Sequence, residues 1–403
     1  MKKITALLLA LLMLVGALAG CGKQNDTNKT DKLSIVTTIF PEYDWVREIL
    51  GDKADNAEVT MLLDNGVDLH SYQPTADDIV KISNCDLVIY VGGESDGWVD
   101  DALKNATNKN RKVINLLDVL GDSVKTEEVV EGMQETEHDH DPDPSKEVST
   151  FEDDEVQDRS LSDWAGDWQS AYPFVLDGTL DDAFAAMAEK GEMTGEEICE
   201  HMEGHDHDED EDHEHEEGED HEHEEEKDEH VWLSLKNAEV LVNAISKSLQ
   251  KLDPDNKDTY ATNAAAYIEK LSALDGEYQA AVDAATYKTV LFGDRFPFRY
   301  LVDDYGLSYY AAFVGCSAET EASFETVSFL AKKVDELKLP CVLTIEGAQH
   351  KISETIVQNT AEKNQKVLTM DSMQSTTSKD VANGTTYLSV MEKNLSVLKE
   401  ALG

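Results

Sequence analysis

The chain has 403 residues and a formal net charge of −50. Residues 131–230 carry 40 Asp and Glu but only four Lys and Arg, whereas the remaining residues have a net charge of −14. We therefore predict a moderately acidic protein of two domains with one very acidic insert, at 131–229, and we expect no nucleic-acid partner because phosphate would be repelled.

The first 21 residues predict a secretory signal. A basic start, an apolar core and small residues lead to Cys21, and the apolar run is short for a membrane span. The sequence Leu-Ala-Gly-Cys at 18–21 resembles the lipobox of bacterial lipoproteins, which implies a lipid on Cys21; an ordinary cleaved signal is the alternative. Residues 22–32 are polar and predict a tether. We expect an extracytoplasmic protein that is anchored to the cell membrane by this lipid.

Residues 33–130 predict an N-terminal α/β lobe. Short apolar, β-branched runs alternate with amphipathic stretches, and this alternation predicts a parallel sheet with helices on both faces. The predicted strands are 33–38, 57–62, 86–91 and 112–116, and the predicted helices are 42–50 and 76–83.

The end of the insert is a histidine-rich tract. Residues 201–230 hold eight of the 12 histidines among 18 acidic residues. Imidazole nitrogen is a preferred ligand of zinc and similar ions, so we predict that the tract gathers such ions weakly; a solvated acidic linker is the alternative. The accessory histidines are His201, His205, His207, His213, His215, His221 and His223.

Residues 230–286 predict connecting helices, at 235–251 and 255–285, and the second is long for a globular protein. The α/β pattern then resumes in a C-terminal lobe at 287–403. Its predicted strands are 289–292, 308–314, 341–345 and 367–370, and its predicted helices are 324–337, 351–363 and 385–401. The predicted fold is α/β, with two parallel-sheet lobes joined by a long helix.

Four polar residues lie where such folds bind ligands. His70 is in a loop between a strand and a helix, His230 closes the acidic tract, and Glu346 and Asp371 each follow a predicted strand. If the lobes face each other, these positions converge on one cleft. Two histidines and two carboxylates would suit zinc or manganese. Each residue alone has a simpler explanation; Asp371, for example, could cap a helix.

Four cysteines besides Cys21 are present, at positions 85, 199, 316 and 341, and they do not form a C-x-x-C pair. A zinc site built of thiolates is therefore not predicted. The sequence does not choose a disulfide pairing, although Cys316 and Cys341 both fall in the last third and could pair.

Several motifs resemble one family. IVTTIFPEYDWVREI at 35–49, DLHSYQPT at 68–75, DLVIYVGG at 86–93 and DEHVWLS at 228–234 are similar to the metal-binding lipoproteins of zinc and manganese ABC importers. These are the ZnuA-like, or cluster A-I, solute-binding proteins. The resemblance implies two α/β lobes linked by one rigid helix, with a metal ion held between them.

The resemblance also implies a ligand set. His70 and His230 match the first two metal-binding histidines, Asp371 the late aspartate, and Glu346 the glutamate near the cleft. The chain departs from the family pattern at the third histidine, where Gly293 stands instead.

Several groups are candidates to replace that histidine. Asp294 is the nearest donor, a histidine of the tract could swing in, and His350 remains a candidate. Arg295 could pair with a carboxylate or exclude a second cation.

A second resemblance lies inside the insert. Residues 160–197 are similar to the opening of the ZinT-type zinc-trafficking domain, but too few residues match to close its barrel. We predict a partial module; the alternative is that its aromatic residues only pack the insert against a lobe.

These features predict a monomeric binding protein that captures Zn²⁺ and delivers it to an ABC permease and its ATPase. A manganese-specific member of the same class and a metal buffer without a permease are the alternatives. We predict no enzymatic activity, because neither an H-E-x-x-H motif nor a general base beside an open zinc position is evident.

Overall fold

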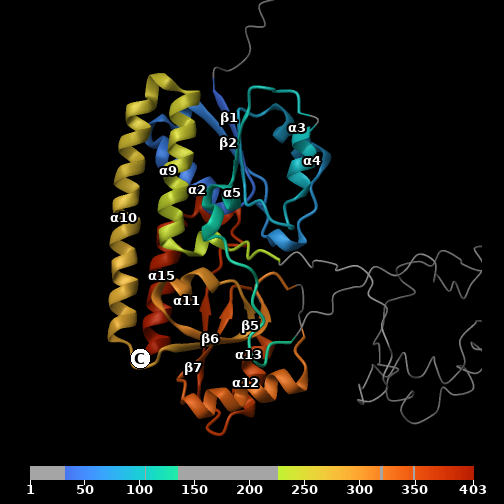
Figure 1. Cartoon of the computed structure of the whole chain (residues 1–403), viewed down its shortest axis with the longest axis vertical. Helices are drawn as coiled ribbons and strands as arrows, with labels where there is room; N and C mark the ends of the chain where they lie inside the picture. The colour runs from blue at the N-terminus through green and yellow to red at the C-terminus, as the bar shows by residue number, and fades with distance from the viewer. Residues whose placement is uncertain (1–31, 105, 135–225, 318–320, 348–349) are drawn as a thin grey trace, which may run out of the picture. The chain divides into compact units, whose positions relative to one another are not determined.

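A computed structural model describes residues 32–104, 106–134, 226–317, 321–347 and 350–403 (Figure 1). These residues fall in one compact unit. The predicted signal with Cys21, the segment 160–197 and the seven accessory histidines lie outside the described residues. No helix within the described ranges is long and apolar enough to cross a membrane.

The N-terminal lobe is a parallel sheet of four strands in the order β2-β1-β3-β4. The strands are β1 Leu33–Thr37, β2 Ala57–Met61, β3 Leu87–Tyr90 and β4 Lys112–Asn115. The helices are α2 Phe40–Leu50, α3 Ala76–Asn84, α4 Trp98–Lys104 and α5 Leu116–Leu120. Strand β1 lies between β2 and β3, and its last three residues are buried, as expected for an inner strand of a parallel sheet.

The C-terminal lobe repeats this topology with the order β6-β5-β7-β8. Its strands are β5 Thr289–Phe296, β6 Ser308–Val314, β7 Cys341–Ile345 and β8 Lys366–Met370. Its helices are α11 Arg299–Tyr305, α12 Phe324–Leu337, α13 Lys351–Asn359, α14 Ser378–Ala382 and α15 Tyr387–Leu402. In each sheet the first strand, β1 or β5, has the second strand on one side and the third on the other, so the strand order reverses there. Ligands of such sheets bind at the carboxyl ends of the strands at this point.

Two helices connect the lobes, α9 Leu235–Leu252 and α10 Lys257–Ala284. With 28 residues, α10 is about 42 Å long. It packs against α9 and α2 of the N-terminal half and against α11 and α15 of the C-terminal half, so that it runs along both lobes (Figure 1). Its buried Tyr278 donates a hydrogen bond to the carbonyl oxygen of Met391 over 2.6 Å. The prediction of two parallel α/β lobes joined by a long helix is confirmed.

Cys316 and Cys341 do not pair; they and Cys85 are free thiols. The reason is topological. Cys341 is the first residue of strand β7, whereas Cys316 follows the end of β6. In a parallel sheet the amino ends of all strands lie on one side and the carboxyl ends on the opposite side. Cys199 lies outside the described residues.

Candidate metal centre

The first histidine, His70, is positioned by the turn that contains it. Asp68 caps the short 3-10 helix Leu69–Ser71, and its Oδ1 accepts a hydrogen bond from the backbone N–H of His70 over 3.0 Å. The ring is fixed as well, because its Nδ1 lies 2.6 Å from Oγ of Ser95, in the loop after β3. Glu229 Oε2 is 3.6 Å from the same nitrogen. The Nε2 atom of His70 is therefore the one left to bind a cation.

The second histidine, His230, is fully buried and precedes the 3-10 helix Val231–Leu233. Its backbone N–H and its Nδ1 both lie 2.9 Å from Oδ1 of Asp228. The following turn is anchored to the C-terminal lobe, since Trp232 Nε1 donates to the carbonyl oxygen of Ser372 over 2.9 Å. Asp228 thus sets the orientation of the His230 ring, and its Nε2 remains available.

The two available nitrogens meet: Nε2 of His70 lies 3.2 Å from Nε2 of His230. Two nitrogens bound to one tetrahedral zinc ion, each at 2.0–2.1 Å, are about 3.3 Å apart. Each ring also has a partner on its other nitrogen, an arrangement common to histidines that bind metals. The pair therefore has the spacing and orientation of two ligands of one ion.

The two imidazoles differ electrostatically. Burial and the nearby charges of His230 and Arg295 lower the pKa of His70 to about 3. Burial also opposes a charge on His230, but the hydrogen bond to Asp228 and the charges of Asp228, Glu127 and Glu229 outweigh it and raise the pKa of His230 above 6.5. Near neutral pH, His70 is therefore neutral, and of the two imidazoles His230 is the one that binds a proton more readily.

The predicted carboxylate ligands are bonded within the C-terminal lobe. Glu346 accepts hydrogen bonds from the backbone N–H and the hydroxyl of Ser372, over 2.6 and 2.7 Å, and from the N–H of Gln374. Asp371 Oδ1 accepts from the N–H of Met373 over 2.8 Å. Burial and the charge of Asp371 raise the pKa of Glu346. These contacts give both carboxylates a role in shaping the loop after β8, and their role as ligands stays a prediction.

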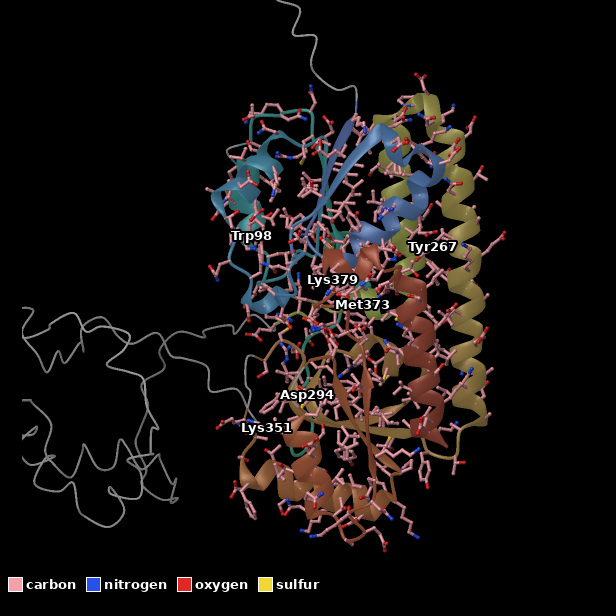
Figure 2. All side chains as sticks on the ribbon, turned by 180° about the vertical axis from the view of Figure 1, so that it is seen from behind. Trp98, Tyr267, Asp294, Lys351, Met373 and Lys379 are labelled. Atoms are coloured by element: carbon pink, nitrogen blue, oxygen red, sulfur yellow. The ribbon has the colours of Figure 1, made fainter. Side chains whose placement is uncertain are left out.

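Asp294 and His350 share a contact with Thr344, which lies within the C-terminal lobe. Oδ2 of Asp294 accepts a hydrogen bond from the hydroxyl of Thr344 over 2.6 Å, and Nδ1 of His350 lies 3.2 Å from that hydroxyl. Figure 2 shows Asp294 lower in the C-terminal lobe than Met373. Within the described residues, two groups of three potential ligands were found, and neither includes Asp294, His350, Glu346 or Asp371.

Gly293 lies in a crowded part of strand β5. A Cβ atom on Gly293 would lie 2.6 Å from Cα of Ser353 in α13, a distance that real side chains do not allow. Arg295, two residues after Gly293, forms an ion pair with Asp68, with 2.7 Å between Nη2 and Oδ2. Of the two functions considered for Arg295, pairing with a carboxylate is the one observed.

Sequence reasoning missed three residues of this centre, Cys316, Glu127 and Asp228. His70, His230 and Cys316 each offer a ligand atom within 4.8 Å of the others, and Glu127, Asp228 and His230 form a second such group. Cys316 lies two residues after the end of strand β6, close to the kind of position that singled out Glu346 and Asp371. The position after a predicted strand could therefore have indicated Cys316, whereas nothing in the sequence around Glu127 indicates that it lies beside His230.

Comparison with known proteins identifies the family of this chain. The family model described as zinc-uptake complex component A, periplasmic, matches residues 35–157 and 165–401. The zinc-binding lipoprotein AdcA of Streptococcus pneumoniae is 30% identical over 400 residues, which are 99% of this chain and 61% of that protein. This chain thus spans about three fifths of the length of that relative. The high-affinity zinc uptake system protein ZnuA of Bacillus subtilis is 26% identical, over 95% of this chain and 93% of its own.

A solved structure supports the same assignment. The Zn(II)-bound ZnuA-like domain of Streptococcus pneumoniae AdcA is 26% identical, with a TM-score of 0.56 over 92% of this chain and 99% of that domain. The family model and this likeness together cover both lobes. The chain belongs to the ZnuA family, the component A proteins of zinc-uptake complexes.

Proposed function

We propose that this protein captures Zn²⁺ outside the cytoplasmic membrane and delivers it to an ABC permease and its ATPase. The observation that carries the proposal is the 3.2 Å approach of the two Nε2 atoms of His70 and His230, each with its other ring nitrogen already bonded. The names of the relatives, a zinc-binding lipoprotein and a zinc uptake protein, support the same cargo. A lipid on Cys21 would hold the protein near the permease.

The choice of zinc rests on the type of ligand. Two imidazoles at tetrahedral spacing suit zinc, whereas manganese prefers sites that are rich in oxygen. In the proposed site His70 and His230 bind the ion, and Asp371, Glu346 and Asp294 are the carboxylates that remain candidates to complete its coordination. The histidines of the tract at 201–223 would gather ions weakly and raise their concentration near the tight site.

Titration with zinc tests this proposal. The variants are His70→Ala with His230→Ala, and a chain that lacks residues 201–225; His350→Ala is the matched control, because His350 lies outside both groups of potential ligands. We expect the double variant to lose the tight site and the deletion to lose only weak binding. A tight site that survives in the double variant would refute the proposal.

Two further measurements separate the rivals. Competition between Zn²⁺ and Mn²⁺ by calorimetry distinguishes a zinc-specific from a manganese-specific protein, and we expect zinc to displace manganese. Uptake of radioactive zinc by cells that make this chain with its permease distinguishes delivery from buffering. Zinc uptake that does not depend on the chain would support the alternative of a metal buffer without a permease.

A further inference from the structure

We propose that Cys316 supplies a third ligand to the cation, so that the tight site contains two imidazoles and one thiolate. This inference rests on the proposed function, since it describes the same site. Its first support is geometric: a ring nitrogen of His70, a ring nitrogen of His230 and Sγ of Cys316 all lie within 4.8 Å of one another. A zinc ion bound to such a set needs S and N atoms about 3.6 Å apart, which is within the 4.8 Å limit of this group.

In strand β5, the contacts of Gly293, Asp294 and Arg295 are with residues other than the histidine pair. Gly293 has no room for a side chain beside Ser353. Asp294 accepts a hydrogen bond from Thr344, and Arg295 is paired with Asp68. Another element offers a donor closer to the pair: β6, the neighbour of β5 in the sheet, ends directly before Gly315 and Cys316.

The turn that contains Cys316 is fixed against His230. A Cβ atom on Gly315 would lie 3.0 Å from both Cε1 and Nδ1 of His230, so the glycine backbone rests on the imidazole. The two carboxylate oxygens of Glu127 accept hydrogen bonds from the N–H groups of Gly315 and Cys316 over 3.2 and 3.3 Å. Arg295 Nη1 donates to the carbonyl oxygen of Ser317 over 3.3 Å.

These contacts explain the glycine before the cysteine and give Glu127 a structural role. Side chains from the N-terminal lobe and from β5 position the same short turn, so Cys316 is presented to the histidine pair by both halves of the protein. Such positioning of a ligand by neighbouring groups is typical of metal sites.

A thiolate at this point would determine which metal is bound. Binding breaks the S–H bond of Cys316, releases its proton to the solvent and forms a bond between sulfur and the metal, without any oxidation or reduction. Soft thiolate ligands favour zinc and cobalt over manganese. In a tetrahedral site, one thiolate and two neutral imidazoles also leave a single coordination position for a carboxylate or a water molecule.

Cobalt is the probe for this ligand. The full chain is loaded with one equivalent of Co²⁺, and its near-ultraviolet spectrum is recorded for the charge-transfer band that only a sulfur ligand produces. We expect the band in the wild type, its loss in Cys316→Ser, and a decrease in zinc affinity of roughly 10- to 100-fold in that variant. Cys199→Ser and Cys341→Ser are the matched controls and should keep both the band and the affinity.

The outcomes separate this inference from the proposed function. If the wild type gives no sulfur band, or if Cys316→Ser keeps it, Cys316 is not a ligand, even where His70→Ala with His230→Ala abolishes tight binding. If the histidine variant keeps the tight site, the proposed function itself fails. Should Cys316→Ser not fold, X-ray absorption of the zinc-loaded Cys199→Ser chain decides, because a ligating Cys316 gives a sulfur neighbour at about 2.3 Å.

Discussion

Arg295 of β5 and Asp68 of the His70 turn form an ion pair between the two lobes, with 2.7 Å between Nη2 and Oδ2. The other oxygen of the same carboxylate accepts a hydrogen bond from the backbone N–H of His70. Asp68 therefore connects the position of the first histidine to the C-terminal lobe. It also neutralises a fixed positive charge that would otherwise oppose a bound cation.

We expect Asp68→Asn to weaken zinc binding by roughly two- to fivefold, the range typical of a partly exposed ion pair. Asparagine still caps the turn, so the loss comes from the missing negative charge and from the unpaired Arg295. Calorimetry at low and high salt measures the effect, which should shrink as salt screens the charges. Asp101→Asn, an exposed residue paired with Lys104, is the control, and an unchanged affinity of Asp68→Asn at low salt would contradict the prediction.

The partners of the two rings provide a second prediction. Removing a charged partner from a ligating histidine typically costs 10- to 100-fold in metal affinity. We therefore expect a loss of roughly this size in Asp228→Asn, which deprives His230 of its carboxylate, and a smaller loss in Ser95→Ala, because the partner of His70 is neutral. A competition titration against a chelator measures both. Equal losses of zinc affinity in the two variants would show that the negative charge of Asp228 does not strengthen metal binding by His230.

The pH dependence of capture follows from the two imidazoles. His70, with a pKa of about 3, is already deprotonated above pH 5. His230 has a raised pKa, and protonated imidazole cannot bind a metal. Zinc affinity should therefore increase with pH through and above 6.5 and level off once His230 has lost its proton.

The same reasoning predicts how a variant shifts this curve. In Asp228→Asn the pKa of His230 should fall, so the increase in affinity should move to lower pH, although the plateau itself is weaker. Calorimetry in buffers of different ionisation enthalpy counts the protons released. A wild-type affinity that stays constant between pH 6 and 8 would contradict the assignment of the proton to His230.

Much of the fold could be predicted from local pattern. The strands 308–314 and 341–345 coincide with β6 and β7, because buried parallel strands are short apolar runs that a sequence displays directly. The helices α4, α5, α11 and α14 were not predicted. Each has five to seven residues, too few for a helical period to emerge.

The site was predictable only in part, for a physical reason. His70 and His230 stood out because of their motifs, and the structure brings them together although 160 residues separate them. The crowding at Gly293 depends on Ser353, 60 positions away, and the contact between Gly315 and His230 depends on how the lobes pack. Neither relation leaves a local mark in the sequence. Cys316 was overlooked because the cysteines were considered as disulfide partners and as C-x-x-C pairs, and not as single ligands beside histidines.

The N-terminal lobe contains a buried acid that should make stability depend on pH. Burial and the neighbouring carboxylate of Asp96 raise the pKa of Glu42 to about 8 from an ordinary value of 4.5. Its Oε2 accepts hydrogen bonds from the N–H groups of Thr38 and Ile39, while its Oε1 is buried without a partner. The folded protein thus prefers the protonated acid.

The sign of the effect follows from this preference. Below pH 4.5 both the folded and the unfolded chain hold the proton, so Glu42 does not reduce stability there. Between pH 4.5 and 8 the unfolded chain loses the proton first, and the free energy of unfolding therefore falls as the pH rises. Each unit of pKa difference corresponds to about 1.4 kcal/mol, so the total is on the order of a few kcal/mol.

Glu42→Gln removes this titration, and we expect its stability to vary less between pH 4.5 and 8 than that of the wild type. The variant need not be more stable at every pH, because the amide nitrogen that replaces Oε1, an atom without a hydrogen-bond partner, is a buried donor that needs an acceptor of its own. Urea unfolding at a series of pH values measures the slope. Glu58→Gln, at an exposed position of β2, should keep the wild-type slope, and an equal slope in Glu42→Gln would mean that Glu42 is ionised in the folded protein.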